Sequence, residues 1–481
     1  MEEAYLLMNI ACVEKPRVLS IDQQPKWRHE HKLSLFPRRA ALLTCNVCAL
    51  DDSSSPIYMC PPCDFVVHLR CLKLPRVIRM SRHLHRIYFV PSFGKGDRSC
   101  GVCRKEINSD YGGYSCIKDG CSYAAHSKCA TRINVWDGEE LEHVPEEIEE
   151  EEEPFMRISD GIIQHFSHQQ HHLRLLDENM GRDYDEDKQC HACITPIYFG
   201  NFYSCMQCDF ILHEACANLS RKILNPIHPH LLSLSLVERK DSVYAMSSCK
   251  ACRRYYTAGF FYECTKGEEC NFELHVQCAT ISEPLIHGSH MQPLFLTSKP
   301  GEGRTCSVCD TIEPVFVETF NCIECEFSLC YGCATTPQKV RYKHDKHVLS
   351  LAYGGREETN TVMNWCELCE RKIEPKERFY ACDDYCCATL HVACLIGEDL
   401  YIKPGSSFFY YSNINVHVLP NNHHMSRPIC NFCNQRCQQK TVFQRSRSIV
   451  CCLLHTLFRK SPVANLFCSM SCRAFALGRG K

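Results

Sequence analysis

The sequence predicts a tandem array of small, β-rich modules that are stabilised by bound metal and not by one large hydrophobic core. The 481-residue chain contains 40 cysteines and 25 histidines, and this excess indicates either disulfides or metal ligands. Cys-x2-Cys pairs recur along the chain, usually after a pair of histidines. Leucines often follow the histidines at alternate positions, as at Leu33/Leu35 and Leu232/Leu234, which is the period of a short strand with one buried face.

The first Cys pair of each repeat sets the period of the array. Successive pairs are mostly 55 to 64 residues apart, and one interval, between the second and third pairs, is 90 residues. A fixed period of this kind predicts repeated units that share one fold. The first pairs are Cys45/Cys48, Cys100/Cys103, Cys190/Cys193, Cys249/Cys252, Cys306/Cys309, Cys366/Cys369 and, at the end of the chain, Cys430/Cys433.

Three further doublets surround the first Cys pair, in a constant order, in six repeats. The leading histidines are His29/His31, His83/His85, His168/His171, His228/His230, His287/His290 and His344/His347. A second Cys pair follows the first after 11 or 12 intervening residues: Cys60/Cys63, Cys116/Cys121, Cys205/Cys208, Cys264/Cys270, Cys322/Cys325 and Cys382/Cys386. After four more residues a closing doublet completes each repeat: His68/Cys71, His126/Cys129, His213/Cys216, His275/Cys278, Cys330/Cys333 and His391/Cys394.

The four doublets of a repeat have the composition of two structural zinc sites. Structural zinc takes four Cys or His ligands in a tetrahedron, so we expect about two zinc ions in each full repeat. The short link between the second pair and the closing doublet favours an interleaved pairing, in which the first Cys pair joins the closing doublet and the leading histidines join the second Cys pair. A sequential pairing, with two independent knuckles, is the alternative. Cys330 stands where other repeats have histidine, an exchange that preserves a zinc ligand.

The cellular compartment decides between zinc and disulfides. Disulfide scaffolds persist in oxidising environments, usually behind a signal peptide. The N-terminus is acidic, carries only a short apolar patch and lacks a basic segment before it, and no apolar run reaches the length of a membrane span. We therefore expect a reduced, intracellular chain without a transmembrane segment, in the cytoplasm or the nucleus, and the reduced state favours zinc.

The long interval between the second and third repeats contains an acidic stretch at residues 139–153 with five consecutive glutamates. Such a stretch cannot bury a core and repels itself, which predicts a flexible linker. The predicted organisation is an N-terminal extension at 1–28, modules 1 to 6 at 29–75, 83–133, 165–220, 228–282, 287–337 and 344–398, an acidic linker at 137–160, and a partial C-terminal module with a basic tail at 417–481.

Metal binding also explains how such short modules fold. A unit of about 50 residues has little core, whereas a structural zinc supplies about 10–16 kcal/mol in zinc-finger peptides. The small core is expected from an aromatic two residues before each second pair and from another aromatic after it, the latter being Phe65, Tyr123, Phe210, Phe272 and Phe327. Module 6 has Ala388 at the second position, and Cys12 and Cys387 lie outside the doublets.

These patterns resemble the plant Cys/His-rich divergent C1 domain family over nearly the whole chain. The similarity includes the string HFSH at His165–His168, the Tyr-x-Cys before the second pairs, RPICNFC ending at Cys433, and FCSMSC ending at Cys472. It implies C1-type modules, zinc-finger-like and β-rich, each with a short helix near the closing doublet. It also implies a role in plant stress or hormone signalling, and metal ligands at Cys430, Cys433, Cys468 and Cys472 in the terminal fragment. One departure is His172, which rivals His171 as a ligand.

The function expected is that of a non-catalytic interaction scaffold whose partners are other proteins. No thioredoxin-like unit surrounds the Cys pairs, and no substrate site is indicated. A RING-like ubiquitin ligase is the enzymatic alternative, which six copies with leading histidines disfavour. Binding of a diacylglycerol-like lipid is a second alternative, although no Gln-Gly step precedes the second Cys pairs. Residues 400–481 carry eleven Lys and Arg and no acidic residue, so nucleic acid or an anionic lipid could bind that tail, or the acidic linker could attract it.

Overall fold

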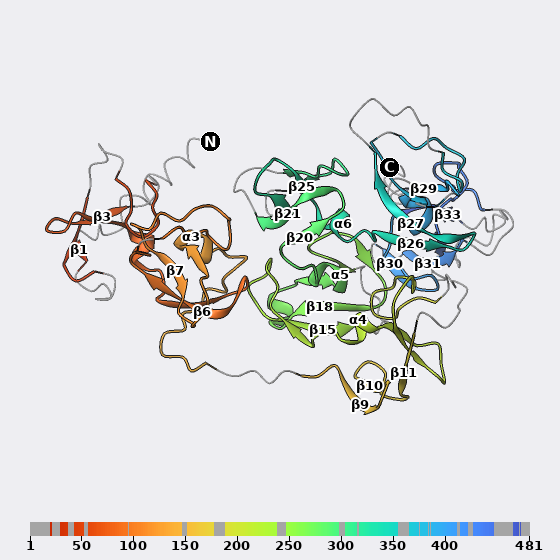
Figure 1. The fold of residues 1–481 in the computed structure, drawn as a ribbon, viewed down its shortest axis with the longest axis horizontal. Coiled ribbons are helices and arrows are strands. Elements are labelled where there is room, and N and C mark those ends of the chain that lie inside the picture. Colours follow the sequence, from red (N-terminus) through yellow and green to blue (C-terminus); the bar gives the residue numbers. More distant parts are fainter. Residues whose placement is uncertain are drawn as a thin grey trace, which may run out of the picture. The chain divides into compact units, whose positions relative to one another are not determined.

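The structure is a computed structural model, and it describes residues 20–21, 29–36, 43–51, 56–94, 96–146, 152–177, 188–237, 247–297, 304–314, 317–354, 365–374, 376–382, 384, 386–410, 414–421, 427–446, 465–470 and 472. Its contacts divide the chain into two compact units, Met1–Ile148 with Leu224–His230, and Glu149–Ile223 with Leu231–Lys481. Each unit consists of small sheets with very short helices (Figure 1).

Module 2 shows the fold that recurs along the chain. Its four-stranded antiparallel sheet has the order β5 (Val77–Met80), β6 (His83–Val90), β7 (Gly113–Cys116) and β8 (Ala124–His126). The helix α3 (Ser127–Ala130) follows directly. The alternation of the sequence determines which face is buried, since successive side chains of a strand point to opposite faces. Each module is therefore a simple meander that ends in one helical turn.

The same order of strands is found in the other modules. Unit 1 also contains β1 (Ser20–Ile21), β2 (Leu33–Leu35), β3 (Ile57–Cys60), β4 (Phe65–His68) and α2 (Leu69–Leu72). Modules 3 and 4 contain β9 (Phe155–Ser159), β10 (Ile162–His165), β11 (Leu173–Leu176), β12 (Phe202–Cys205), β13 (Ile211–His213), α4 (Glu214–Ala217), β14 (Lys222–Ile223), β15 (Leu232–Leu236), β16 (Ser247–Ser248), β17 (Tyr255–Tyr256), β18 (Phe260–Cys264), η1 (Gly267–Glu269), β19 (Glu273–His275) and α5 (Val276–Ala279).

Modules 5 and 6 and the C-terminal module complete the second unit. Modules 5 and 6 contain β20 (Leu285–His287), β21 (His290–Thr297), β22 (Arg304–Thr305), β23 (Ile312–Glu313), β24 (Thr319–Cys322), β25 (Ser328–Leu329), α6 (Tyr331–Ala334), β26 (Lys339–Tyr342), β27 (Asp345–Tyr353), β28 (Arg378–Cys382), β29 (Thr389–His391) and α7 (Val392–Ile396). The terminal sheet consists of β30 (Ser407–Tyr410), β31 (Ile414–Pro420), β32 (Thr441–Ser446) and β33 (Asn465–Phe467).

The acidic linker is shorter than the sequence predicted. Phe155–Ser159, which we assigned to the linker at 137–160, forms strand β9 and pairs with β10 at the edge of the module 3 sheet. This sheet consequently has five strands and begins before residue 165. The predicted end of the linker at residue 160 was wrong because it rested on the acidic composition alone. The residues directly after Pro154 are apolar and favour a strand.

The described first part of the linker lies against module 2 and is not a free coil. Arg76 forms a 2.6 Å ion pair with Glu142. Arg86 donates to the backbone oxygens of Val144 and Pro145 at 2.5 and 2.7 Å. Glu142 thus has a basic partner within its own unit, and residues 141–146 lie against module 2 and do not extend from it as a free segment. Residues 147–151 of the linker, and residues 447–464 and 473–481 of the basic stretch at 400–481, lie outside the described residues, so the attraction between linker and tail stays a hypothesis.

The C-terminal module has a complete sheet, although the sequence predicted a partial module at 417–481. Its strands have the order β30-β31-β32-β33, as in the other modules, and the first of them begins at residue 407. In its described residues this module lacks the second Cys pair. In module 6 the first cysteine of that pair, Cys382, is paired with Leu349 across the sheet. The equivalent position in the C-terminal module is Arg445, which is paired with Val416. The predicted loss therefore concerns metal ligands and not the fold.

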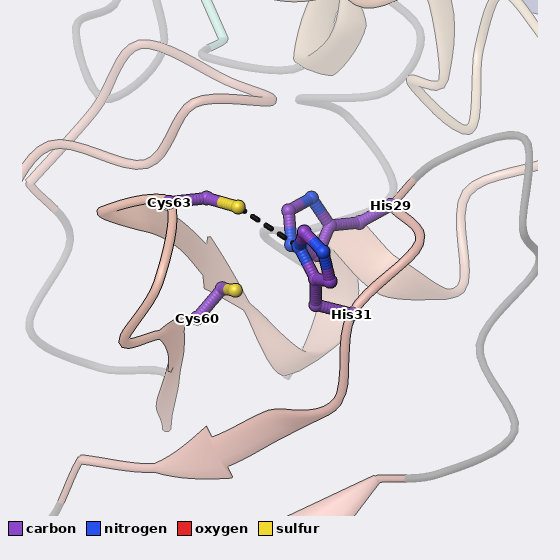
Figure 2. Close-up of side chains that lie close together, drawn as sticks. All are labelled: His29, His31, Cys60 and Cys63. Atoms are coloured by element: carbon purple, nitrogen blue, oxygen red, sulfur yellow. Dashed lines mark hydrogen bonds between the residues drawn. The ribbon is translucent and has the colours of Figure 1, made fainter.

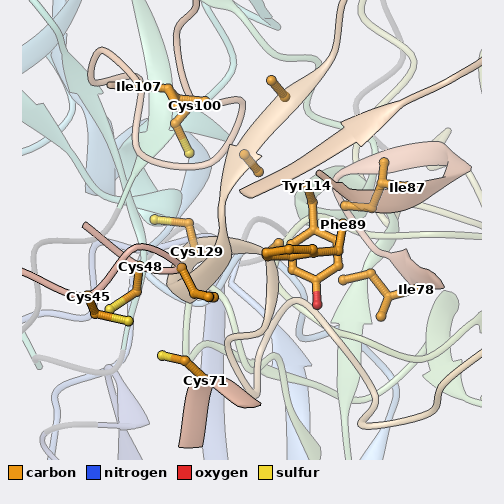
Figure 3. Packing of buried hydrophobic residues seen from close by; sticks show 14 of the residues in the cluster. Cys45, Cys48, Cys71, Ile78, Ile87, Phe89, Cys100, Ile107, Tyr114 and Cys129 are labelled. Carbon is orange, nitrogen blue, oxygen red and sulfur yellow. The ribbon is translucent and has the colours of Figure 1, made fainter. Parts of the chain in front are cut away.

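Modules 1 and 2 share one hydrophobic core. The cluster contains Ile78, Ile87, Phe89 and Tyr114 together with the first-pair cysteines of both modules. Figure 3 shows the aliphatic side chains around Tyr114 on one side and cysteine sulfur atoms on the other. The Tyr114 hydroxyl donates to the Pro75 oxygen at 2.7 Å, which satisfies its polar end inside the core. The aromatic before each second pair is buried as predicted: Tyr58, Tyr114, Tyr203, Tyr262, Phe320 and Tyr380.

The second aromatic has a role beyond the one we expected in modules 1, 2, 3 and 5. In modules 1 and 2 it packs against the shared core as predicted, and in all four modules it also stacks on a leading histidine. The ring centroids of His29 and Phe65 are 4.4 Å apart with an interplanar angle of 6°, and those of His83 and Tyr123 are 4.2 Å apart at 11°. The aromatic ring thereby fixes the orientation of a histidine at the edge of the module.

Candidate metal centres

The first Cys pair lies in a tight turn that its own backbone closes. In module 1 the Cys45 amide donates to the Leu50 oxygen and the Ala49 amide donates to the Cys45 oxygen, both at 2.9 Å. The residue after the second cysteine adopts a left-handed conformation, which costs about 1–2 kcal/mol for a residue with a Cβ. A structural zinc contributes several times this amount, so metal binding can maintain the turn. The left-handed residues are Ala49, Arg104, Ile194, Arg253, Asp310, Glu370 and Asn434.

The closing doublet is positioned by the short helix that the family resemblance implied. His68 ends β4 and is the N-cap of α2 in an extended conformation, and Cys71 lies on the helical turn that follows. A spacing of three residues across this junction directs both side chains to one side. The helix is only four residues long, which indicates that it serves to present the cysteine and not to build a helical layer.

In module 1 these two elements bring four buried donors together. The ligand atoms of Cys45, Cys48, His68 and Cys71 all lie within 4.8 Å of one another. His68 Nδ1 is 3.4 Å from Cys48 Sγ and 3.8 Å from Cys71 Sγ. The three thiols and one imidazole form a donor set that suits tetrahedral zinc. We call this arrangement, and its equivalent in each module, the first site.

The first site recurs in the other modules with nearly constant geometry. The distance from His Nδ1 to the sulfur of the second cysteine is 3.4 Å in module 2, 3.3 Å in modules 3 and 4, and 3.2 Å in module 6. In module 5 Cys330 takes the place of histidine, with its sulfur 3.8 Å from that of Cys309. Cys330 also accepts from the Cys333 amide, so the exchange of His for Cys preserves the site.

Cys193 of module 3 differs in one respect from what the sequence predicted for it. We expected only a metal ligand, but its sulfur has two partners: it lies 3.3 Å from His213 Nδ1, as a ligand should, and 2.9 Å from Thr195 Oγ1. The Cys193 side chain is 7% exposed, and together with His213 and Cys216 it lines a cavity of about 570 Å³. A hydroxyl can donate to a thiolate, so Thr195 supports this ligand and does not replace it. The threonine two residues after the cysteine recurs as Thr311 in module 5, a signal that the sequence reasoning missed.

The leading histidines and the second Cys pair form another group, which we call the second site. In module 1 it consists of His29, His31, Cys60 and Cys63, with His31 Nδ1 2.9 Å from Cys63 Sγ (Figure 2). In module 2 His85 lies 3.6 Å from Cys116, and His83 lies 3.6 Å from Cys121. These groups match the interleaved pairing and not the sequential one.

In module 3 the second site settles which of two adjacent histidines takes part. The group consists of His168, His171, Cys205 and Cys208, and His172 is not a member. In module 4 the rings of His228 and His230 are 5.0 Å apart. Burial there, with a smaller contribution from His230, lowers the pKa of His228 to about 4, which keeps its ring neutral as a metal ligand requires. Burial, followed by the bond to Cys264, raises the pKa of Cys270 to about 11.

Electrostatics within a first site favour a cation. Hydrogen bonds from Cys48 and then Cys71 hold the pKa of Cys45 far below its usual range. The same thiolate, together with Cys48, raises the pKa of Cys71 far above it. Three thiols in one buried cluster therefore cannot all ionise by themselves, because each thiolate opposes the next. A divalent cation removes this conflict and allows all of them to act as ligands.

The prediction that His287 is a ligand of module 5 is wrong. The ring of His287 is buried, with Nδ1 2.7 Å from Ser289 Oγ and Nε2 3.1 Å from Gln338 Nε2. It lies opposite His290, across the two-residue turn of the β20–β21 hairpin. Spacing along the chain could not reveal this, since the position of the turn decides which residues face the second Cys pair.

The prediction that His344 is a ligand of module 6 is wrong for a related reason. His344 lies at the exposed tip of the β26–β27 hairpin, because Tyr342 and Asp345 are the paired residues that flank the turn. Asp345 replaces it: its Oδ2 is 3.0 Å from Cys386 Sγ and its Oδ1 is 3.0 Å from His347 Nδ1. Asp345 and His347 share one face of β27, as alternate residues of a strand do. Carboxylate oxygen is an accepted zinc ligand, so the donor set becomes Asp, His and two Cys.

The four terminal cysteines assemble as a first site. Cys433 Sγ lies 3.8 Å from Cys468 Sγ, and Cys468 Sγ lies 3.3 Å from Cys472 Sγ. The sequence reasoning overlooked Cys437, which is fully buried in the core of this module. Burial and the neighbouring thiols raise its pKa to about 12. It stands seven residues after the first cysteine of the pair, where module 2 has the buried Ile107, and this correspondence could have revealed its place in the core.

Comparison with known families agrees with this architecture. A family model described as C1 domain matches residues 27–72, 81–130, 166–217, 226–279 and 342–395. A second model, described as C1 domain-like, C-terminal, matches residues 416–473. The chain therefore belongs to the C1 domain family, and it is a multi-module protein of tandem C1-type zinc-binding domains. The matched ranges leave out module 5, whose ligands differ most from those of its neighbours.

Neither the curated proteins nor the solved structures contain a significant match to this chain. In the part of the chain that the structure describes, none of the helices has the length and apolar character needed to cross a membrane.

Proposed function

We propose that the protein is a non-catalytic interaction scaffold whose modules are held rigid by zinc. The observation that carries this proposal is the closed first site: in module 1 all four donors come from the chain and all four are buried. Catalytic zinc keeps a coordination position open for water or substrate, and a site of this kind leaves none. In module 4 the ring of Tyr401 covers the ligand His275 with their centroids 3.7 Å apart, which closes that site further.

The proposed metal content is about two zinc ions in each of modules 1 to 6 and one in the C-terminal module. Five groups of suitable donors have the membership described above, and eight further groups of at least three His, Cys, Asp or Glu donors occur in the described residues. Metal analysis of reduced, purified protein tests this number. A total of about seven ions would mean that only the first sites bind.

Exposed apolar side chains beside the second sites supply contact points for protein partners. In module 2 Leu84, between the two leading histidines, is 75% exposed, and Ile117, after the first cysteine of the second pair, is 62% exposed. In module 5 Met291 and Ile323 occupy equivalent places and are 95% and 58% exposed. We call the two exposed apolar residues beside each second site the tip of that module. Exposed apolar side chains on a rigid, metal-bound segment are typical of a surface that is buried on association.

Capture of partners by the zinc-loaded full-length chain tests the scaffold proposal. Leu84→Asp with Ile117→Asp should abolish the association of proteins that bind module 2 while the zinc content is unchanged. Ile133→Asp is the matched control, because Ile133 belongs to the same module and is 91% exposed but lies outside its doublets. If the double variant keeps every partner, the tips are not the contact points. If no protein associates specifically with the zinc-loaded chain, the scaffold role itself is wrong.

The cellular role belongs to the same proposal. A scaffold of zinc-stabilised modules in the cytoplasm or the nucleus fits a signalling function, and the resemblance in sequence points to plant stress or hormone signalling. Proximity labelling in plant cells, with the tip variant beside the wild type, would identify the partners and the compartment. If the wild type labels signalling proteins and the tip variant does not, the result supports this role. If the wild type and the tip variant label the same proteins, the result contradicts it.

A further inference from the structure

Among the residues that the structure describes, the second site of module 5 has one donor fewer than that of module 2. In module 2 the hairpin turn lies between Met80 and His83, which pair across it. The two leading ligands are the residue that opens the second strand and the residue two places later, His83 and His85. In module 5 the turn lies between His287 and His290, so the corresponding residues are His290 and Gln292.

The strand register confirms the equivalence of Gln292 and His85. In module 2 Ile87, two residues after His85, pairs with Cys116. In module 5 Leu294, two residues after Gln292, pairs with Cys322. Gln292 thus stands at the level of the second Cys pair, where every other full module has a histidine.

The other donors of this site are arranged as in module 2, since the register of β21 and β24 places Cys322 where module 2 has Cys116. His290 Nε2 lies 3.6 Å from Cys325 Sγ, the same distance as between His83 and Cys121 in module 2. The ring of His290 stacks on Phe327 with a centroid distance of 4.3 Å and an interplanar angle of 8°. The geometry that orients the first leading histidine is therefore retained without a second histidine beside it.

His287 is not available to replace the missing histidine. It is only 5% exposed, and Ser289 and Gln338 engage its two ring nitrogens. His165 of module 3 is held in the same way, with Nδ1 2.6 Å from Ser167 Oγ, and that module has two other leading histidines in its site. The first histidine of the His-x-Ser-His arrangement thus secures the hairpin, and only the second, His168 or His290, belongs to the site.

We propose that the second site of module 5 binds zinc through His290, Cys322 and Cys325 and keeps its fourth coordination position for an exchangeable ligand. This inference rests on the zinc binding of the proposed function. A glutamine amide is neutral and is not among the usual ligands of zinc, so water or an external donor takes this position. Cys325 is exposed, and the position is accordingly open to solvent on that side.

The chemistry of the site favours a neutral nitrogen donor, the imidazole of a histidine side chain on a partner. Two thiolates already balance the charge of Zn²⁺. The exposed carboxylates of Glu324 and Glu326 flank Cys325, and they disfavour an anionic ligand. An incoming imidazole would complete the two-Cys, two-His donor set that the second site of module 2 has from its own residues.

Cobalt substitution of the full-length chain tests the open position. Imidazole added to the cobalt-loaded protein should change the visible spectrum by the equivalent of one site, and a small thiol should change it less. Gln292→His should abolish the response because the chain then supplies the fourth ligand. Gln292→Ala, the matched control, should preserve it. A wild-type spectrum that imidazole does not alter, at full metal content, would overturn the proposal.

Zinc retention provides an independent measurement that also separates this inference from the proposed function. Under a mild chelator the wild type should lose one zinc equivalent before the others, and Gln292→His should retain it. His287→Ala should leave the total number of bound zinc ions unchanged; loss of one ion in this variant would restore His287 as a ligand and contradict the open site. A protein that binds almost no zinc at all would instead refute the proposed function.

Discussion

The first and second sites of a module differ in what surrounds them. In module 1 every donor of the first site is buried, whereas His31 and Cys63 of the second site are exposed. The first site links the turn of the first Cys pair to the short helix of the closing doublet, inside the core. The second site links the hairpin that carries the leading histidines to the second Cys pair, at the surface. The difference explains where the donors vary. Asp345 and Gln292 both occur in second sites, whereas the first-site exchanges, Cys330 and Cys468, each preserve a strong zinc ligand.

Loss of a first site should have the largest effect. Cys100→Ser in module 2 removes a fully buried ligand from the core that modules 1 and 2 share. We expect this module to unfold at 25 °C, since a structural zinc contributes about 10–16 kcal/mol. Limited proteolysis should then cleave within residues 77–130. Cys387→Ser, an exposed cysteine outside the doublets, is the control. Resistance to proteolysis in Cys100→Ser would mean that the first site does not hold the fold.

Loss of a second site should cost one zinc ion but leave the module folded. Cys60→Ala and His31→Ala remove the same ion, so the double variant should have the zinc content of either single variant. The expected destabilisation is about 1–3 kcal/mol for His31→Ala, because His31 is exposed, and it is larger for Cys60→Ala, because Cys60 is buried in the shared core. Metal analysis and thermal unfolding of the three variants are the measurements. Two ions lost in the double variant would show that Cys60 and His31 belong to different sites.

A smaller effect is expected at the carboxylate ligand of module 6. Asp345→Ala should lower the zinc content by one ion under a mild chelator, and His344→Ala should not. Asp345→His should retain the ion more firmly than the wild type, because imidazole is a better zinc ligand than a single carboxylate oxygen. Should His344→Ala release the ion while Asp345→Ala does not, the hairpin turn lies elsewhere than between Tyr342 and Asp345.

The smallest effect concerns a buried histidine that is not a ligand. Burial lowers the pKa of His165 from 6.5 to about 4, so the folded protein resists the protonation that the unfolded chain undergoes below pH 6.5. The stability that the neutral ring provides is therefore present above that pH and is lost as the pH falls towards 4. Between pH 7.5 and 5.5 the loss is about 1 kcal/mol. His165→Gln should destabilise the protein at pH 7.5 but reduce this pH dependence in thermal unfolding. An unchanged pH dependence would show that another group is responsible.

The sequence predicted the fold and most of each site because zinc ligation imposes fixed spacings. The doublets, the closing His-x2-Cys and the exchange at Cys330 are visible in the order of residues alone. The errors at His287 and His344 arose where a hairpin turn shifts the register, and a shift of one residue changes the face of every side chain. The role of Cys437 was hidden because cysteine serves both as a ligand and as a small apolar residue. The hydroxyl partner of Cys193 was missed because the ligand pattern considers only Cys and His.

The strands at the module boundaries were also missed, for a different reason. β9, at Phe155–Ser159, follows the glutamates without a turn signal, and β1, at Ser20–Ile21, pairs with module 1 from within the predicted N-terminal extension. Both are strands at the edge of their sheets. Their pairing depends on a neighbouring strand that the local sequence does not reveal.

The number of zinc ions bound by the reduced, full-length protein tests the central claim most directly. Native mass spectrometry with parallel metal analysis would measure it on the folded chain. Two interleaved sites in each of six modules and one in the C-terminal module predict about thirteen ions, one of which leaves readily. A total of about seven ions, one for each module, would contradict the two-site module, and a metal-free protein with oxidised cysteines would show that disulfides and not zinc hold the modules together.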